Sequence, residues 1–409
     1  MNPSAPQPRI CLLVSSFYPV VGGGETHARL LCKEFRRRGE NVFVLTRRRV
    51  KESPVFETVD DIPIHRVPPS GVPRLGKYLM LLPAFLTLCR RRNDYDLIYV
   101  CGLRILGIVG VLAARLLGKK CVLRSESRGE FSGGFIWNNI LGETTRPLLK
   151  VLFSGPIRLR NYFLKKTDAF LSISGIIREE FEACGIPPAQ TASIANGIDT
   201  ETFQPVDAAR RLALRKQLHL PEDRFIFAYS GKLNRGKGLD FLMQIWPKWM
   251  AAHPNSALLL IGGGRMQFLS CEAELREQVR TNRLEESVLF TGYVTNVNEH
   301  LQAADAFLFP SESEALPLAL LEALACELPT IASDIGGNRD VVVDGQEGCI
   351  APLKDEKTWL GLMNDFVTQP DKARQLALKG RETVCRQFSI AHVADEHLKL
   401  FERICREGS

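Results

Sequence analysis

Short apolar segments alternate with amphipathic, helix-like segments along nearly the whole chain. Five apolar segments in the first half are expected to form strands, at 10–15, 42–46, 97–101, 121–124 and 169–173. Five more follow in the second half, at 225–230, 257–261, 288–292, 306–309 and 330–333. Alternation of this kind is typical of parallel sheets covered by helices on both faces. The pattern therefore predicts an α/β protein of two Rossmann-like, doubly wound halves that face a central cleft.

The length of 409 residues agrees with this division, because a single hydrophobic core stops growing well below that size. We assign residues 1–205 to a first domain and the residues from 206 onward to a second. A turn-rich segment that contains Pro205 and reaches Pro221 is interpreted as the linker.

Basic residues are concentrated in the first half of the chain. Residues 1–200 contain 29 Lys and Arg against 17 Asp and Glu, a net charge of +12, whereas the remainder has 24 against 29. Three arginine triplets, at 36–38, 47–49 and 90–92, stand out. Each can be the solvated end of a helix or strand, and a basic half can also serve an anionic membrane or an acidic substrate. No nucleic-acid-binding motif accompanies them, so nucleic acid is not an expected partner.

Two apolar segments, 78–89 and 105–117, lie just before basic residues and keep a membrane interaction open. Both are shorter than the roughly 20 residues that a membrane span requires, so peripheral contact is the most that they support. The polar start of the chain does not resemble a signal peptide. Eleven cysteines without CxxC spacing favour reduced, packed thiols in a cytosol over disulfides or a zinc site.

The segment 309–333 carries two glutamates, Glu314 and Glu322, separated by seven residues. Its pattern predicts a strand, a polar loop and a helix over 318–325 with Pro317 in the first turn. A helix start presents unpaired N–H groups and a partial positive charge, which suit a phosphate ester. One carboxylate could then hold a ribose and the other a hexose. The alternative is that Glu314 only complements the helix dipole and Glu322 lies on a solvated face, although a carboxylate among Leu and Ala needs a partner.

A basic loop follows the strand at 225–230. It contains Gly231, Lys232, Lys237 and Gly238, so two ammonium groups five residues apart can contact a diphosphate without a metal ion. The loop is not a Walker A motif, because Gly238 stands where Ser or Thr would be required. A solvated basic turn is the simpler alternative.

Three consecutive glycines, Gly22 to Gly24, follow the first strand and precede a helix expected over 26–38. Such a triplet permits positive φ and close approach of a ligand, and it can equally be a tight turn. The GxGxxG pattern is absent, since His27 stands three residues beyond Gly24, so a dinucleotide dehydrogenase is poorly supported. His27 itself is expected to be a packed or capping imidazole.

Asp94 and Asp96 spell the DxD of metal-dependent sugar transferases, but they directly precede the strand at 97–101. We interpret them as a strand-entry turn. Arg124, Glu126 and Arg128 follow another strand, where open α/β sheets bind ligands, and are candidate acceptor contacts.

The segment that follows, up to Lys166, can be a mobile acceptor lid or ordinary helical packing. Its aromatic residues are Phe131, Phe135, Trp137 and Phe153.

Together these segments resemble family 4 of the retaining, nucleotide-sugar-dependent glycosyltransferases, which have the two-domain GT-B fold. The most specific match is the E-x7-E pattern of Glu314 and Glu322 within ESEALPLALLEALA. The segment NGIDTETF, residues 196–203, is similar to the family's NGVDxxxF, and Gly336-Gly337 is similar to its Gly-Gly turn. The resemblance covers nearly the whole chain. It implies that the terminal helix, residues 388–409, returns to complete the first domain and that the second domain spans 206–387.

The resemblance also implies residue roles. Lys232 and Lys237 would hold the donor diphosphate and, with Glu314, form the catalytic set, Glu314 binding the transferred sugar and Glu322 the ribose. No metal and no cofactor is implied, the nucleoside-diphosphate sugar being the donor substrate. Further donor contacts would come from Gly22, Gly23, Gly231, Gly292, Tyr293 and Val294, and from the backbone of Ala315, Leu316, Pro317 and Leu318.

The sequence departs from the family pattern in several places. Lys232 stands where Arg is common, which keeps the charge, and Ala315 stands where Gly is common. Residues 124–126 occupy a stretch that often carries a His, so the polar group beside the sugar is not identified. Asp340 replaces a frequent Glu and has a shorter reach.

We therefore expect a cytoplasmic glycosyltransferase, at the inner face of a membrane if peripheral contact is made. It would transfer a hexose from a nucleoside-diphosphate sugar, with UDP the expected nucleotide, to a glycan or lipid-linked acceptor in polysaccharide or glycoconjugate biosynthesis. Two alternatives stay open: a nucleotide-sugar epimerase of the same fold and a noncatalytic nucleotide-sugar-binding protein. The sequence does not name the sugar or the acceptor.

Overall fold

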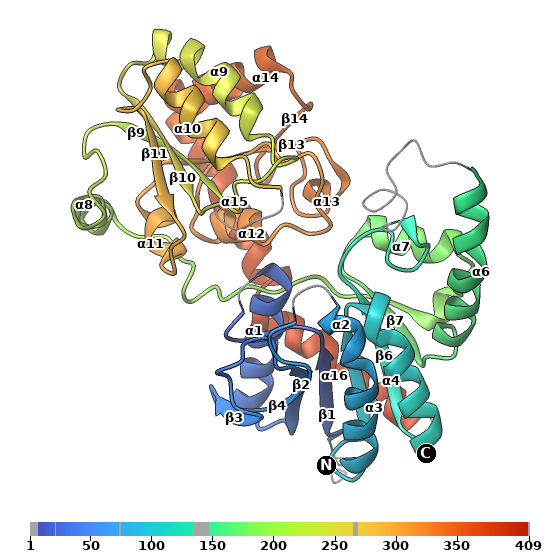
Figure 1. Ribbon diagram of the computed structural model, residues 1–409. Coiled ribbons are helices and arrows are strands. Elements are labelled where there is room, and N and C mark those ends of the chain that lie inside the picture. The colour runs from blue at the N-terminus through green and yellow to red at the C-terminus, as the bar shows by residue number, and fades with distance from the viewer. Residues whose placement is uncertain (1–6, 21, 73–74, 135–146, 265–268, 408–409) are drawn as a thin grey trace. The chain divides into compact units, whose positions relative to one another are not determined.

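The computed structural model describes residues 7–20, 22–72, 75–134, 147–264 and 269–407, which form two compact units (Figure 1). The first unit comprises Met1–Gly197 together with Ile390–Ser409, and the second comprises Ile198–Ser389. The sequence analysis placed these boundaries at 205 and 387. They lie at Gly197 and Ser389 because the Gly197 N–H donates to His27 of the first unit, whereas the Ile198 N–H donates to the Phe388 carbonyl of the second.

The first unit is built on a sheet with the strand order β3-β4-β2-β1-β5-β6-β7-β8, in which all neighbours are parallel except β3 and β4. Ile10 of β1 lies opposite Val42 of β2 and Leu97 of β5, and these central strands are buried. The strands are β1 (Ile10–Val14), β2 (Val42–Arg47), β3 (Phe56–Val59), β4 (Ile62–Val67), β5 (Leu97–Cys101), β6 (Lys120–Ser125), β7 (Ala169–Ser172) and β8 (Thr191–Ser193).

Helices cover both faces of this sheet. Right-handed crossovers place the helices that connect β4 through β7 on one face and the helix after β1 on the other. Accordingly α3 packs against α4 and α4 against α6, whereas α1 packs against the terminal helix α16. The helices are α1 (Gly23–Arg37), α2 (Gly76–Leu79), α3 (Leu81–Arg90), α4 (Leu103–Leu117), α6 (Pro147–Leu164), α7 (Gly175–Ala183) and α16 (Ile390–Arg406).

The second unit contains a parallel sheet with the order β11-β10-β9-β12-β13-β14, in which β9 and β12 are neighbours. Its strands are β9 (Phe225–Ser230), β10 (Ser256–Ile261), β11 (Val288–Gly292), β12 (Ala306–Phe309), β13 (Thr330–Ser333) and β14 (Cys349–Ala351). Its helices are α8 (Ala208–Gln217), α9 (Leu239–Ala252), α10 (Glu272–Thr281), α11 (Val297–Gln302), α12 (Leu318–Ala325), α13 (Gly336–Arg339), α14 (Glu356–Thr368) and α15 (Pro370–Gln387).

All ten predicted strands are present, with ends displaced by at most one residue. The sequence analysis missed β3, β4, β8 and β14. The side chains of β3 are exposed or half-buried, and β8 and β14 have only three residues each, so none presents a long apolar run. The β3–β4 hairpin turns at Asp60 and Asp61, which both have positive φ, as in a type I′ turn.

The segment interpreted as a linker is not structureless. Residues 208–217 form α8, and the Asp207 side chain caps this helix by accepting from the Arg210 N–H at 2.7 Å. The prediction of a turn-rich linker up to Pro221 was therefore wrong for these residues. Their helical pattern is weak because only two of them, Leu212 and Leu214, are large and apolar, and only Leu214 and Arg215 of α8 are buried.

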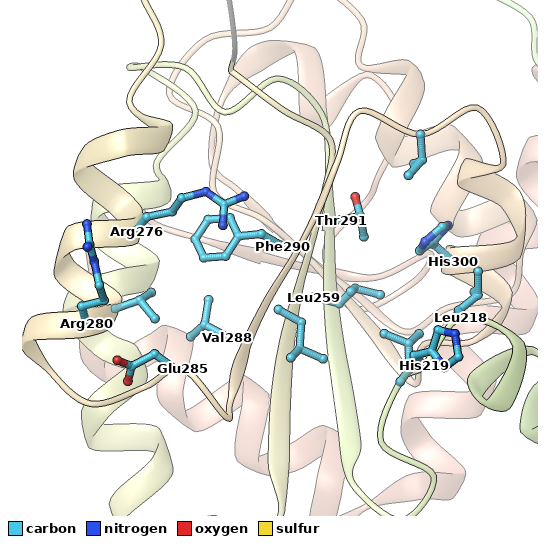
Figure 2. Close-up of a pocket in the computed structure, with 14 residues that line it drawn as sticks. Leu218, His219, Leu259, Arg276, Arg280, Glu285, Val288, Phe290, Thr291 and His300 are labelled. Carbon is cyan, nitrogen blue, oxygen red and sulfur yellow. The ribbon is translucent and has the colours of Figure 1, made fainter.

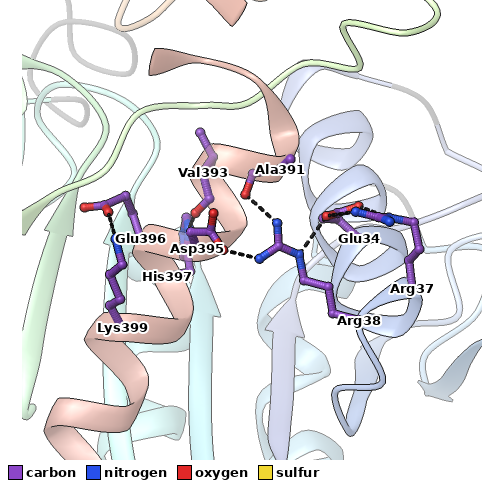
Figure 3. A network of polar contacts seen from close by, with 9 residues as sticks. All are labelled: Glu34, Arg37, Arg38, Ala391, Val393, Asp395, Glu396, His397 and Lys399. Atoms are coloured by element: carbon purple, nitrogen blue, oxygen red, sulfur yellow. Dashed lines mark hydrogen bonds and ion pairs between the residues drawn. The ribbon is translucent and has the colours of Figure 1, made fainter. Parts of the chain in front are cut away.

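The terminal helix α16 is attached to the first unit by both apolar and polar contacts (Figure 3). Arg38 donates to Glu34, to Asp395 and to the Ala391 carbonyl, which joins the end of α1 to α16. In the core, the His397 ring lies 2.9 Å from the Tyr99 hydroxyl and 2.7 Å from the Val393 carbonyl. Burial lowers the pKa of His397 to about 3, so the imidazole is neutral at physiological pH.

Candidate functional site

The predicted diphosphate loop and the first glutamate of the E-x7-E pattern meet in the second unit. Lys237 lies on the loop after β9, and Glu314 lies on the loop after the neighbouring strand β12. The Lys237 ammonium is 2.5 Å from Glu314 Oε1, and the two side chains are 26% and 16% exposed. Ser311 Oγ donates to the same oxygen at 2.7 Å. The other oxygen of Glu314 has no hydrogen bond within the described residues and is available to a ligand.

Glycines allow this close approach of the loops. Gly238 has φ +68°, and a Cβ there would lie 2.1 Å from the Pro310 carbonyl oxygen at the end of β12. The Glu312 N–H donates to the Gly236 carbonyl at 3.0 Å, which ties the two loops together directly. From the other side, a Cβ on Gly337 would lie 2.5 Å from the Glu314 carbonyl oxygen. Any side chain at Gly238 or Gly337 would therefore displace the backbone that carries Glu314.

The helix predicted over 318–325 is α12, with the same ends. Pro317 is the N-cap residue, with ψ 110°, rather than a member of the first turn as predicted. The first backbone bond runs from the Leu321 N–H to the Pro317 carbonyl at 3.3 Å, so the N–H groups of residues 318–320 have no partner within the helix. The start of α12, next to Glu314 in the chain, thus offers donors and a partial positive charge.

Glu322 lies just over one turn into α12 and is half-buried. Burial raises the pKa of its carboxyl to about 7. Its side chain has no ion pair or hydrogen bond to any other described residue, so the structure contains no internal partner that would account for a carboxyl group in this position. The interpretation of Glu322 as a residue on a solvated face does not fit this environment.

The remaining predicted donor residues of the second unit occupy loops at the same edge of the sheet. Lys232 is exposed, and within the described residues its ammonium group contacts no carboxylate. Gly231 follows β9 with φ +148°. A Cβ on Gly262 would lie 2.1 Å from the carbonyl oxygen of Gly231, so these two loops are in close contact. Gly292 ends β11 with φ +67°. The structure thus brings Lys237, Glu314 and the residues before α12 together, but it leaves Lys232 without a partner.

A separate cavity of about 740 Å³ lies along the edge strand β11 of the second unit (Figure 2). It is lined by α10 on one side and by Leu218, His219 and His300 on the other. Val294 is the one residue of the predicted donor set that borders it. The sequence analysis gave no signal for this cavity, because its lining comes from four separate segments.

The glycine triplet of the first unit differs from its prediction. Gly22 is the N-cap of α1 with extended backbone, and Gly23 and Gly24 form the first helical turn, so none of the three adopts positive φ. The helix starts three residues earlier than expected. A Cβ on Gly24 would lie 3.2 Å from the Glu126 carboxylate, so the missing side chain leaves room for Glu126 beside the start of α1.

The predicted acceptor residues after β6 fall into two groups. Arg124 is 1% exposed, and it donates to Asn196 Oδ1 and lies 3.8 Å from the Cys101 sulfur, so it is engaged in the fold. Arg128 is exposed, and Glu126 is half-buried. Burial raises the pKa of Glu126, with Arg124 opposing the rise and Glu25 adding to it. Glu126 and Arg128 are therefore the better candidates for contact with a ligand.

His27 is a packed imidazole. It is fully buried, and its Nδ1 accepts from the Gly197 N–H at 3.1 Å. Burial, with Arg124 and His397 nearby, lowers the pKa of His27 well below its ordinary value. His27 is thus a neutral acceptor that holds the Asn196-Gly197 segment, as the packed interpretation predicted.

The Asp94–Asp96 segment is a strand-entry turn, as expected. Asp96 accepts from the Arg9 backbone N–H and guanidinium, and the intervening Tyr95 is buried. Phe131 is likewise a core residue, in edge contact with Phe170 and Phe181. Phe135 and Trp137 of the proposed acceptor lid lie outside the described residues, as does the side chain of Phe153.

Two family models match the chain. The model "Glycosyltransferase Family 4" matches residues 21–202, and the model "Glycosyl transferases group 1" matches residues 210–383. They meet close to the boundary between the two units and together span most of the sequence. The chain belongs to the family 4 glycosyltransferases. It is an enzyme, a hexosyltransferase with the GT-B fold.

The matching regions cover most of this chain and most of each similar protein. The α-maltose-1-phosphate synthase of Mycolicibacterium smegmatis is 26% identical over 318 residues, which cover 73% of this chain and 76% of that protein. The putative glycosyltransferase EpsD of Bacillus subtilis is 27% identical over 377 residues, 90% of this chain and 91% of that protein. The crystal structure of Anabaena HepE in complex with UDP and glucose has a TM-score of 0.75 and 19% identity, and it covers 97% of this chain and 99% of that one.

None of the helices in the described residues combines the length and apolar content needed to cross a membrane. Within the same residues, no group of three or more His, Cys, Asp or Glu side chains is arranged to hold a metal ion.

Proposed function

We propose that this family 4 glycosyltransferase transfers a hexose from a nucleoside-diphosphate sugar to a glycan or lipid-linked acceptor with retention of anomeric configuration. The observation that carries the proposal is the pairing of Lys237 and Glu314 beside the start of α12. It combines a cation for a diphosphate, a carboxylate for sugar hydroxyls and helix N–H groups for phosphate oxygens. The UDP and glucose named with the structure of Anabaena HepE favour a UDP-sugar donor.

Each candidate donor-site residue of the second unit has a distinct role in this proposal. Lys237, with Lys232 folding inward on binding, neutralises the diphosphate, and the backbone of residues 315–318 contacts its oxygens. Glu314 binds the hexose through the oxygen that Lys237 and Ser311 leave open. Glu322 accepts from the ribose hydroxyls, which supplies the partner that its carboxyl lacks. The turn at residues 292–294 contacts the base.

In the proposed reaction the bond between the anomeric carbon and the donor phosphate oxygen breaks. A bond from the acceptor oxygen to the same carbon forms on the same face of the sugar. The acceptor proton passes to the departing diphosphate, which carries the negative charge that develops. Lysine and helix N–H groups stabilise this charge without a metal ion, and stabilisation of a developing charge by fixed groups is commonly the largest single contribution to catalysis.

The acceptor is assigned to the first unit, where half-buried Glu126 and exposed Arg128 follow the carboxyl end of β6. The same unit has an apolar stripe on α2 and α3 in which Leu75, Tyr78, Leu79, Leu82 and Leu86 are 41–66% exposed. No Asp or Glu occurs in α2, α3, α4 or α6, whereas α1, α7 and α16 all contain them. We therefore assign this helical face to peripheral contact with an anionic membrane surface, in the cytoplasm.

Replacement of Lys237 tests the donor site. Lys237→Ala should lower kcat for release of UDP from UDP-glucose in the presence of acceptor by about 10²–10³-fold, as for loss of one stabilising group in other enzymes. Its melting temperature should fall by only a few degrees, because Ser311 still donates to the Glu314 carboxylate when the lysine is gone. The matched control is Arg235→Ala, which removes the same charge from the same loop but breaks only an exposed pair with Glu274. This control should keep its activity.

Retained transfer in Lys237→Ala with normal donor affinity would remove the lysine from its assigned role. A screen of nucleoside diphosphates by thermal shift identifies the donor, because a ligand that binds only the native state raises the melting temperature. Product analysis without acceptor then separates transfer from epimerisation, since an epimerase would convert the nucleotide sugar under these conditions and a transferase would not.

A further inference from the structure

The arginine triplet at 47–49 lies at the carboxyl end of β2, which is placed between β1 and β4 in the sheet of the first unit. Arg47 is the last residue of β2 and is 5% exposed. Its Nε and Nη1 atoms are buried and have no hydrogen-bond partner among the described residues. Within the described residues, no carboxylate pairs with Arg47, Arg48 or Arg49.

An arginine in this state is unusual, because burial of a charge without a partner is strongly unfavourable. Native proteins satisfy nearly all buried polar groups, and the exceptions call for a functional or ionic explanation. Arg49 increases the imbalance. Burial, and secondly the positive charge of Arg49, lower the pKa of Arg47, so the two guanidinium groups are close enough to repel each other. The fold holds two like charges near each other, and no carboxylate among the described residues offsets them.

Ser16 and Gly76 lie directly beside the two guanidinium groups. Ser16, which follows β1 and is 7% exposed, accepts from Arg49 Nη1 at 3.4 Å. A Cβ on Gly76, the first residue of α2, would lie 2.4 Å from Arg47 Nη1, so the absence of a side chain makes room for the guanidinium. This position, just beyond the carboxyl ends of parallel strands, is where open α/β sheets bind ligands.

We propose that Arg47 and Arg49 form an anion site for a phosphate or diphosphate group of the acceptor. Arg49, which is exposed, can present its planar guanidinium fork to phosphate oxygens in a bidentate manner, which a lysine cannot do, and Arg47 adds a second positive charge. Leu75 and Tyr78, on either side of Gly76, are 66% and 52% exposed and suit the hydrocarbon of a lipid phosphate. A water-soluble sugar phosphate presents the same anionic group. The assignment to the acceptor rests on the proposed function, whereas the anion site itself does not.

Inorganic pyrophosphate is the probe for a calorimetric titration of the full chain. The titration uses a Lys237→Ala background, so that the donor site contributes little. Added Arg47→Met should weaken pyrophosphate binding at least tenfold. The matched control is Arg92→Met, which removes the same charge from another triplet at an exposed position without an ion pair among the described residues. This control should change the affinity by less than twofold.

Equal affinity in the Arg47→Met variant and its parent would overturn the proposal, as would a parent that binds no pyrophosphate. If Arg47→Met fails to fold, Arg49→Met decides the matter in the same way, because Arg49 is exposed and its loss leaves the core intact. The result is independent of the donor assignment. Retained transfer by Lys237→Ala would defeat the proposed role of that lysine and leave the Arg47-dependent binding to be measured.

Vesicles distinguish the two sources of the phosphate group. Co-sedimentation is measured with phosphatidylcholine vesicles that contain or lack phosphatidic acid. If Arg47→Met weakens binding to the phosphatidic acid vesicles as it weakens pyrophosphate binding, the phosphate belongs to a lipid. If it weakens only pyrophosphate binding, the phosphate belongs to a soluble acceptor. If it weakens neither, the two arginines do not form an anion site.

Discussion

The arginine triplets at 36–38 and 47–49 have the same sequence, but they differ in whether carboxylates pair with them. In the first, Glu34 accepts from Arg37 and Arg38, and Arg38 also reaches Asp395 and the Ala391 carbonyl of α16 (Figure 3). In the second, no arginine is paired with a carboxylate among the described residues, although Arg47 is more deeply buried than Arg38. A basic cluster at the end of a helix or strand can therefore stabilise the fold through ion pairs, or it can keep an unpaired positive charge that suits an anionic ligand.

The largest effect should follow from breaking the first cluster. Glu34→Ala should lower the free energy of unfolding by about 2–3 kcal/mol, because it leaves Arg38 without one of two carboxylates in a mostly buried position. Arg37 also loses its bonds to Glu34, but its mostly exposed guanidinium can turn to water, so most of the lost stability comes from Arg38. Urea denaturation measures the change. Glu402→Ala, which removes an exposed pair on α16, serves as the control and should cost less than 1 kcal/mol. Equal costs would mean that the two clusters do not differ in the way described.

Acid should have the next largest effect, again on the α1–α16 side. The pKa of His397 is lowered to about 3 by burial, so the stability that its neutral form contributes is complete above the ordinary histidine pKa of about 6.5 and declines as pH falls below it. From pH 7 to pH 5 the loss should be about 2 kcal/mol for this residue. The pKa of Glu34, lowered chiefly by its hydrogen bond to Arg37, adds a loss only below its ordinary value of 4.5.

The control for this pH dependence is His397→Gln, which should show a shallower decline over the same interval. Denaturant titrations at pH 7, 6 and 5 supply the comparison. An unchanged slope in the variant would assign the acid sensitivity elsewhere, with His27, whose pKa is also lowered by burial, the first residue to replace.

The smallest effect on stability should come from the second cluster. Arg47→Met keeps much of the apolar stem and removes an unpaired buried charge, so the free energy of unfolding should stay within about 1 kcal/mol of the parent or rise. Denaturation in phosphate-free buffer makes this measurement. A loss as large as that of Glu34→Ala would show that Arg47 is held by partners after all and would remove the contrast between the triplets.

The strands and the E-x7-E helix could be predicted from sequence because each rests on a local pattern. Apolar runs gave ten strands, and the run from Leu318 to Ala325 gave α12 with its ends. The spacing of Glu34 from Arg37 and Arg38, three and four residues on one helix, is also visible in the sequence. That Lys237 and Glu314 belong to one site followed only from the family resemblance, since 77 residues separate them, and their direct pairing was not predicted.

The misses have physical causes as well. The strand β3 is exposed or half-buried at the edge of the sheet, the next strand β4 contains Pro63, His65 and Arg66, and α8 has only two large apolar residues. The glycine triplet suggested a loop because glycine disfavours helices, yet the contact of Gly24 with Glu126 explains its place in α1. Glu34, three and four residues before Arg37 and Arg38, distinguishes the triplet at 36–38 in the sequence, but its further partner Asp395 comes from 357 residues away and could not be predicted.

The close contact between Gly238 and the Pro310 carbonyl limits how this enzyme can be re-engineered. The segments after β9 and β12 are fitted to each other through the Pro310 carbonyl, so neither can be exchanged independently with that of a relative. A chimera that alters donor preference would have to import both segments from one parent, together with the glycine at position 337. The three loops would therefore have to be exchanged together rather than residue by residue.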